Sequence, residues 1–277
     1  MAYDIAILKS SNADKYDVFA TAFSMAFPNE NISVINMDED IGKGRKLMEK
    51  FDKEKTDMVV ALGPRAAWVS KQGHDTPVLI SMLSQPGRYG LNDSPGVSLD
   101  YSMEQRLKEF IKVIPGTKRI GIIYSEGNDE FVAEAITVAN RIGLKIFEKK
   151  ISDITKLKGA LDEILPLIDA LWMRTDKVVT SNVTVVKQMI ILQALQSKIP
   201  IIGSNKWAVN NGALFCLFTD YEDIGRQTGS MARRMLKGEN FSMMPPARIR
   251  VFVNAYVYER LSASMQVNIS DATVFAN

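Results

Sequence analysis

The segment KRIGIIYSEGND, residues 118–129, repeats the pattern of DIAILKSSNAD, residues 4–14. In both segments an apolar run leads to a serine, then to an asparagine near an acidic residue, and then into helical spacing. A short apolar run followed by such a turn predicts a buried strand that feeds a helix. The repeat predicts that the same strand–helix unit begins two halves of the chain.

Two more pairs of segments extend this repeat. DMVVALG at residues 57–63 matches DALWMRT at 169–175, and TPVLIS at 76–81 matches IPIIGS at 199–204. The pairs follow one another in the same order, each about 110–125 residues apart, which is hard to ascribe to chance. Short apolar runs that alternate with amphipathic segments are typical of parallel sheets covered by helices. We therefore predict an α/β fold of two similar doubly wound parallel-sheet lobes joined by a hinge.

The lobe boundaries follow from interruptions of this pattern. Pro115–Gly116 ends a predicted helix over 103–113, Asp220–Tyr221 joins a strand to a helix, and rigid prolines stand at 245–246. We expect the chain to cross between lobes at these three places. The resulting lobes are 1–116 plus about 221–247 for the first, and 117–220 plus about 248–277 for the second.

Length and composition limit the classes of function. The chain has 277 residues, 46% of them hydrophobic and 24% charged, and a formal net charge of +2, which suits two modest globular lobes. Without a basic stripe, nucleic acid is not expected as a partner. With one cysteine, Cys216, and one histidine, His74, an internal disulfide and a histidine-based metal site are excluded. We expect neither a metal nor a cofactor.

The sequence lacks the usual signatures of enzymes. It contains no strand–GxGxxG–helix, no phosphate-binding Gly-Lys-Ser/Thr loop and no Gly-x-Ser-x-Gly elbow. A cofactor-independent racemase of two α/β lobes would need two facing cysteines, and this chain has only Cys216. Because Cys216 lies in the apolar run 213–218, we expect an inert core thiol. The sequence therefore predicts a binding protein rather than an enzyme.

Candidate ligand-binding residues stand where the predicted strands end. In doubly wound sheets ligands bind at the carboxyl ends of the strands, where loops and helix N-termini converge. The Gly63–Pro64 turn offers backbone N–H groups and a helix dipole to an anion such as a carboxylate, or it is simply an efficient strand-to-helix connection. The candidates on the first lobe are Ser10, Asn12, Gly63, Pro64, Arg65, Ala66, Ser84 and Gln85. Those on the second lobe are Ser125, Asn128, Thr175, Asp176, Ser204 and Asn205, with Asp220 at a chain crossing.

Two acidic candidates have alternative interpretations. Asp176 follows the predicted strand over 170–173, so it either caps the next helix or meets a ligand ammonium group. Asp220 precedes a helix that begins near Tyr221, so an N-cap and a ligand contact are both open.

One stretch resembles a known family. Residues 212–239 read GALFCLFTDYEDIGRQTGSMARRMLKGE, and the combination of GAL, DY, GRQT, MA and LKGE is fairly specific. It is similar to the ABC-transporter substrate-binding proteins of the tryptophan/tyrosine-type group, which have the type I periplasmic-binding-protein fold. Further similarities cover most of the chain. Two departures leave the ligand's identity open: Gln85 stands where the family usually has aspartate, and RTDK at 174–177 replaces a Pro-x-Asp-Asn stretch.

The resemblance implies the solute-binding component of an ABC importer, which closes over a small polar solute such as an amino acid, aromatic or otherwise. Asp176 and Asp220 would then meet the ammonium group of an amino acid. The residues that would hold its carboxylate are Ser10, Asn12, Gly63, Pro64, Arg65, Ala66 and Ser84.

The resemblance also implies a partner and a location. The partner would be an ABC permease, and the chain itself would be a monomer. A family of exported proteins implies a periplasmic or lipid-anchored protein whose signal peptide is absent from this sequence, whereas a complete chain would be cytoplasmic. One alternative function is a sensory module of the same fold that reports ligand occupancy to a signalling partner. A third is an enzyme that acts on a small anion, which would require turnover to be shown.

Overall fold

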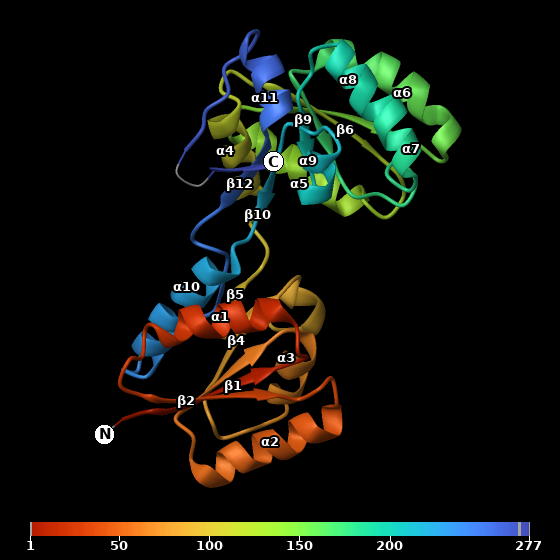
Figure 1. Ribbon diagram of the computed structural model, residues 1–277. Helices are drawn as coiled ribbons and strands as arrows, with labels where there is room; N and C mark the ends of the chain where they lie inside the picture. The colour runs from red at the N-terminus through yellow and green to blue at the C-terminus, as the bar shows by residue number, and fades with distance from the viewer. Residues whose placement is uncertain (1, 271–272, 277) are drawn as a thin grey trace. The chain divides into compact units, whose positions relative to one another are not determined.

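The computed structural model describes residues 2–270 and 273–276, and it divides the chain into two compact units (Figure 1). Unit 1 consists of Met1–Tyr101 and Thr219–Arg248, and unit 2 consists of Ser102–Phe218 and Ile249–Asn277. The chain therefore passes three times from one unit to the other. Within the described ranges no helix has both the length and the hydropathy needed to span a bilayer.

Unit 1 is built on a parallel sheet in the strand order β11-β5-β4-β3-β1-β2. Its strands are β1 (Asp4–Lys9), β2 (Asn31–Asn36), β3 (Met58–Leu62), β4 (Val78–Leu83), β5 (Gly96–Ser98) and β11 (Met243–Met244). Its helices are α1 (Asp14–Ser24), α2 (Ile41–Glu54), α3 (Pro64–Ser70), the 3-10 helix η1 (Pro86–Tyr89) and α10 (Tyr221–Met235).

Helices cover both faces of this sheet, which explains why β1 is a continuous apolar run. Successive side chains of a strand point to opposite faces. Ile5 and Ile7 pack in one core layer with residues of α1 and α10, while Ala6 and Leu8 pack in a second layer with residues of α2 and α3. All four side chains are almost completely buried.

Close packing of α10 on α1 ties the two chain segments of unit 1 together. The sequence supplies glycine where the helices approach, because a Cβ on Gly225 would lie 2.5 Å from the carbonyl oxygen of Phe19. A Cβ on Gly229 would lie 2.9 Å from the Cβ of Ala26, so this helix pair depends on small residues at the contact.

Unit 2 has a sheet in the order β13-β12-β10-β9-β8-β6-β7, in which β12 runs antiparallel to β10 and the other pairs are parallel. Its strands are β6 (Arg119–Tyr124), β7 (Lys145–Lys150), β8 (Ala170–Met173), β9 (Ile201–Gly203), β10 (Phe215–Phe218), β12 (Arg250–Asn254) and β13 (Thr273–Ala276). Its helices are α4 (Met103–Val113), α5 (Asp129–Arg141), η2 (Ile154–Lys156), α6 (Leu157–Ile164), η3 (Leu165–Leu167), α7 (Val183–Val185), the π-helix η4 (Val186–Ile191), α8 (Leu192–Gln196), α9 (Lys206–Asn210) and α11 (Ala255–Ser262).

The strand orders confirm the duplication predicted from the sequence. Unit 1 contains the order β2-β1-β3-β4-β5, and unit 2 contains the corresponding order β7-β6-β8-β9-β10. Each sheet thus places the first strand of its repeat beside the second and the third. The fold class is α/β with two doubly wound, mainly parallel lobes, as expected.

The first chain crossing differs from the expected one. The sequence placed the helix over 103–113 in the first lobe, but α4 belongs to unit 2 and the division falls between Tyr101 and Ser102. Phe110 of α4 packs edge-on against Trp172 and Phe215, with ring centroids 4.9 and 5.9 Å away. Helix α4 therefore packs against the sheet of unit 2 and contributes to its hydrophobic core. The remaining divisions fall at 218/219 and 248/249.

Candidate functional site

In unit 1 the predicted residues after β1 and β3 bond to one another. Ser10 Oγ donates to Leu62 O over 2.7 Å and accepts from the Ala66 N–H over 2.9 Å. The Gly63 N–H donates to Ser81 O over 2.9 Å, and Pro64 has no N–H. The expectation that this turn offers a set of N–H donors to an anion is therefore corrected. Within the described residues, only the Arg65 N–H of this turn is left for a ligand.

Tyr16 decides the conformation of the same turn. Gly63 has φ +85°, and a Cβ at this position would lie 2.1 Å from the Tyr16 hydroxyl. The phenol is buried, 3% exposed, and burial raises its pKa although a hydrogen bond with Ser10 opposes the shift. Glycine is thus required both by the left-handed backbone and by the space that Tyr16 occupies.

Asn12 is held by a charged neighbour that the sequence did not single out. Lys9 ends β1, is only 6% exposed, and pairs with Asp17 over 2.5 Å. The same Lys9 Nζ lies 3.4 Å from Asn12 Oδ1. The exposed Asn12 side chain therefore lies beside an ion pair between the buried Lys9 and the exposed Asp17 at the carboxyl end of β1.

The end of β4 is irregular where Ser84 and Gln85 were predicted to bind. Pairing with β5 shifts register between Ser81 and Leu83, and both Met82 (φ 57°) and Gln85 (φ 52°) are left-handed. Ser84 and Gln85 are exposed, and the Gln85 N–H donates to the Asp100 carboxylate. Left-handed non-glycine residues cost energy and gather at binding sites, which makes this loop the strained part of the unit 1 edge.

In unit 2 both carboxylate oxygens of Asp176 accept hydrogen bonds from residues of the same unit. Oδ1 accepts from Ser125 Oγ, Val178 N and Val179 N, and Oδ2 accepts from Ser125 N and Asn128 Nδ2, all within 2.7–2.9 Å. Burial opposes ionisation, but the backbone donors outweigh it and lower the pKa of Asp176. A carboxylate has about four lone-pair positions, so five donors fill it. Asp176 joins two loops, and its contact with a ligand ammonium stays a prediction.

Arg174, which was not among the predicted site residues, stands in the same cluster. Its Nε donates to Asn128 Oδ1 over 2.8 Å, and its guanidinium carbon lies 3.5 Å from the centroid of Phe131. Burial lowers its pKa, the charge of Arg106 adds to this, and Asp176 opposes it. The signal in the sequence was the basic replacement within 174–177, but the partner Phe131 lies on another element.

The other predicted residues of unit 2 and the acidic residue at the second crossing have structural partners. Thr175 Oγ1 and Ser204 Oγ lie 3.0 Å apart, so the ends of β8 and β9 are linked. Asn205 caps α9 by accepting from Ala208 N over 3.0 Å. Asp220 caps α10 by accepting from Glu222 N over 2.9 Å, so the capping interpretation of Asp220 is confirmed, and the residue belongs to unit 1.

The structure also shows the surroundings of the single cysteine and the distribution of potential metal ligands. Cys216 is completely buried in β10, and burial raises the pKa of its thiol to about 12. Such a thiol is inert at neutral pH. Within the described ranges, no three His, Cys, Asp or Glu side chains gather as they would around a metal ion.

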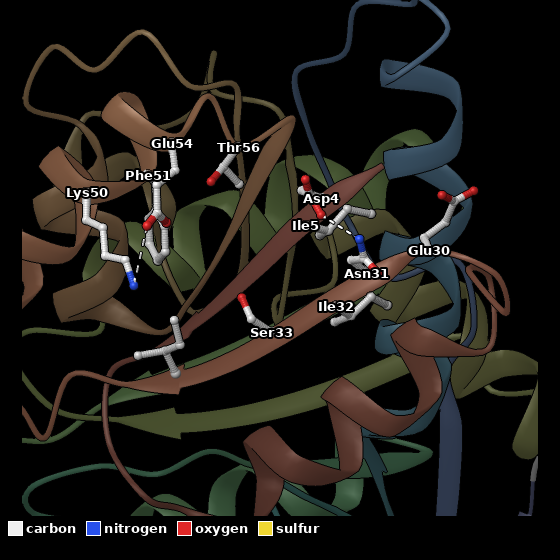
Figure 2. Close-up of a pocket in the computed structure, with 11 residues that line it drawn as sticks. Asp4, Ile5, Glu30, Asn31, Ile32, Ser33, Lys50, Phe51, Glu54 and Thr56 are labelled. Carbon is white, nitrogen blue, oxygen red and sulfur yellow. Dashed lines mark hydrogen bonds and ion pairs between the residues drawn. The ribbon is translucent and has the colours of Figure 1, made fainter. Parts of the chain in front are cut away.

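A separate pocket of about 640 Å³ lies at the amino end of β1, away from the predicted site residues. It is lined by β1, β2 and α2, and Figure 2 shows Asn31 directed at Asp4 and Lys50 at Glu54. Asn31 Nδ2 donates to Asp4 Oδ1 over 2.8 Å, and Lys50 Nζ lies 3.7 Å from Glu54 Oε1. These polar groups already have partners.

Comparison with known proteins identifies the family. The family model described as "ABC transporter substrate binding protein" matches residues 5–274. The chain belongs to this family. A curated relative, the tyrosine-binding protein of Clostridioides difficile, is 29% identical over 229 residues, which are 78% of this chain and 65% of that protein. The match thus spans less than two thirds of the relative's length.

Two solved structures relate the fold of this substrate-binding protein to others. The ligand-free, open form of a substrate-binding protein with adhesive properties from Clostridium difficile shares 25% identity, covers 99% of both chains and has a TM-score of 0.76. A periplasmic ribose ABC transporter protein from Conexibacter woesei shares 11% identity, covers 94% of this chain and 95% of that one, and has a TM-score of 0.55. The substrate-binding protein thus has the type I periplasmic-binding-protein fold.

Proposed function

We propose that this substrate-binding protein is the solute-binding component of an ABC importer and that its solute is an amino acid. The observation that carries the proposal is the family match over residues 5–274. The relative named as tyrosine-binding supports an amino acid, and an aromatic one in particular. The solute is released to an ABC permease, and the protein performs no chemistry on it.

The proposed ligand site consists of the strand carboxyl ends of the two units. Each of these edges carries polar groups that follow the strand ends, such as Ser10 Oγ with the Ala66 N–H in unit 1 and Asn128 with Arg174 in unit 2. In the proposed mechanism, hinge motion at the three chain crossings closes the units over the amino acid. Closure removes water, so charge-assisted hydrogen bonds supply the specificity. In this proposal the protein works as a monomer outside the cytoplasm, in the periplasm or on a lipid anchor, and the family match supports that location.

A thermal-shift screen with the twenty amino acids tests this proposal. A ligand that binds only the folded state at a hundred times its Kd adds about 2.7 kcal/mol of stability. For a chain of this size that raises Tm by roughly 5–10 °C. Isothermal titration then gives the Kd of each positive amino acid. If no amino acid raises Tm, the proposed ligand class is wrong.

Binding alone does not separate transport from sensing, so a second experiment addresses the importer role. Cells that lack the protein should lose uptake of the radiolabelled amino acid, and a plasmid copy should restore it. Unchanged uptake together with an altered transcriptional response to the amino acid would favour the sensory alternative.

A further inference from the structure

Arg174 is fixed in position by two neighbours from α5 and the loop before it. Asn128 Oδ1 accepts from its Nε over 2.8 Å, and the Phe131 ring lies 3.5 Å from the guanidinium carbon. Phe131 in turn packs against Trp172 with ring centroids 5.2 Å apart. A guanidinium stacked on a packed ring is pre-organised, so it loses little conformational freedom on binding a planar anion.

Within the part of the chain that the structure describes, Arg174 makes no ion pair. In contrast to Arg174, two surface arginines of unit 2 make ion pairs. Arg119 pairs with Asp169, and Arg141 pairs with Glu104. Among the described residues no carboxylate oxygen lies within 4.0 Å of Arg174, although Asp176 is close in sequence, because the Asp176 oxygens face Ser125, Asn128 and backbone N–H groups. A half-buried guanidinium with unused N–H donors favours an anionic partner.

Asn128 couples the two charged residues in one orientation only. Its Oδ1 accepts from Arg174 and its Nδ2 donates to Asp176 Oδ2 over 2.8 Å. The donors and acceptors of these three side chains allow no amide flip, because a flipped amide would direct Nδ2 at the guanidinium and Oδ1 at the carboxylate. The guanidinium is therefore held while its remaining nitrogens stay available.

We propose that Arg174 receives the carboxylate of the ligand, so that the carboxylate lies against unit 2 and not against the Gly63 turn of unit 1. The inference rests on the proposed function. It assigns the ligand carboxylate to unit 2, whereas the sequence analysis assigned it to residues of the first lobe. In unit 1, Ser10 and Ser81 already use the N–H groups of Ala66 and Gly63. In unit 2, a planar fork with unused N–H groups matches a carboxylate bidentately.

The experiment measures the Kd of L-tyrosine, L-tyrosinamide and tyramine by isothermal titration for the wild type, Arg174→Ala and Arg174→Lys. Removal of one charge-assisted bidentate contact should weaken L-tyrosine binding by about tenfold or more, and lysine should restore part of it. L-tyrosinamide and tyramine lack the carboxylate, so the wild type and Arg174→Ala should bind them equally.

The matched control is Lys177→Ala, which removes the same charge from an exposed residue of the same loop. It should change the Kd of L-tyrosine by less than about twofold, since screened surface charges contribute little. Circular dichroism and the ligand-free Tm of each variant show that it folds.

The outcomes separate this inference from the proposed function. If the wild type and Arg174→Ala bind L-tyrosine equally, the inference is wrong and the amino-acid function stands. If no amino acid binds, succinate, glutarate and inorganic phosphate are titrated in its place. Binding of either dicarboxylate that depends on Arg174 then supports the inference while the amino-acid function fails. Binding of phosphate alone, or no binding that depends on Arg174, overturns the inference.

Discussion

The Tyr16 hydroxyl occupies the space that a side chain at position 63 would need, since a Cβ on Gly63 would lie 2.1 Å from it. The predicted ligand turn after β3 is thus locked from inside unit 1 by a residue of α1. The Gly63 turn is therefore a rigid connection between β3 and α3, and any contact that it makes with a ligand depends on this rigidity.

Replacement of Gly63 tests this contact. Gly63→Ala should lower the free energy of unfolding by about 2–4 kcal/mol, because it combines a left-handed alanine with an overpacked site. Gly73→Ala is the matched control, since Gly73 also has positive φ, 69°, but nothing within 4 Å of its Cβ position. It should cost only the backbone part, about 1 kcal/mol. Urea unfolding measures both, and equal losses would contradict the clash.

The Gly225 contact between α10 and α1 gives a second prediction. Gly225→Ala places a Cβ 2.5 Å from Phe19 O, so the helices must separate, at a cost of about 2–4 kcal/mol in unfolding free energy. Gly159→Ala in α6 has open space and a helical backbone, so it should stabilise by about 0.5–1 kcal/mol. Denaturation curves of the two variants should therefore shift in opposite directions.

Asp176 should matter for stability more than any exposed carboxylate. Asp176→Asn removes the charge and turns one acceptor into a donor that faces the donors of Ser125 or Asn128. We expect a loss of about 2–4 kcal/mol in unfolding free energy at pH 7, measured by urea denaturation. Asp162→Asn is the control, because Asp162 pairs with Lys158 in the solvent, and it should change stability little.

The pH dependence of the same variant has a definite sign. Folding lowers the pKa of Asp176, so its stabilising contribution is present above the ordinary carboxyl pKa near 4. The contribution is lost as pH falls from there through the folded-state pKa. The stability difference between the wild type and Asp176→Asn should be largest above about pH 5 and shrink below about pH 4. A difference that grows on acidification would refute the assignment.

The hydroxyl pair of Ser81 and Thr228 should couple β4 to α10. Their oxygens lie 3.2 Å apart, both residues are completely buried, and Ser81 Oγ also bonds Val97 O over 3.0 Å. Thr228→Val should cost about 1 kcal/mol of unfolding free energy. A double-mutant cycle with Ser81→Ala should give a coupling of about 0.5–1 kcal/mol, and strict additivity would contradict the hydrogen bond.

Prediction from the sequence worked where the signal was local. The apolar runs of β1 and β6 are each buried on both faces, so their composition alone indicated parallel strands under two helix layers. The N-cap role of Asp220 was one of the two interpretations that the sequence offered, because a cap depends on residues two or three positions away.

Prediction failed where the deciding neighbour is distant in the sequence. α4 was assigned to the wrong lobe because its periodicity showed an apolar face but not that Trp172 and Phe215 cover it. The donors of the Gly63 turn were expected to be free because nothing local shows that Ser10 and Ser81 use them. Arg174 was noticed as a departure only, since its partner Phe131 is 43 positions away on another helix.

The sequence by itself determined the duplicated α/β architecture and the set of polar loops, because strand burial and chain order are written in local patterns that recur. Only the tertiary structure decided which of those polar groups are already satisfied and which keep unused donors. The physical reason is that a hydrogen bond or a cation–ring contact forms only between groups within about 3–4 Å of each other. The fold brings such groups together from residues that are far apart in the sequence.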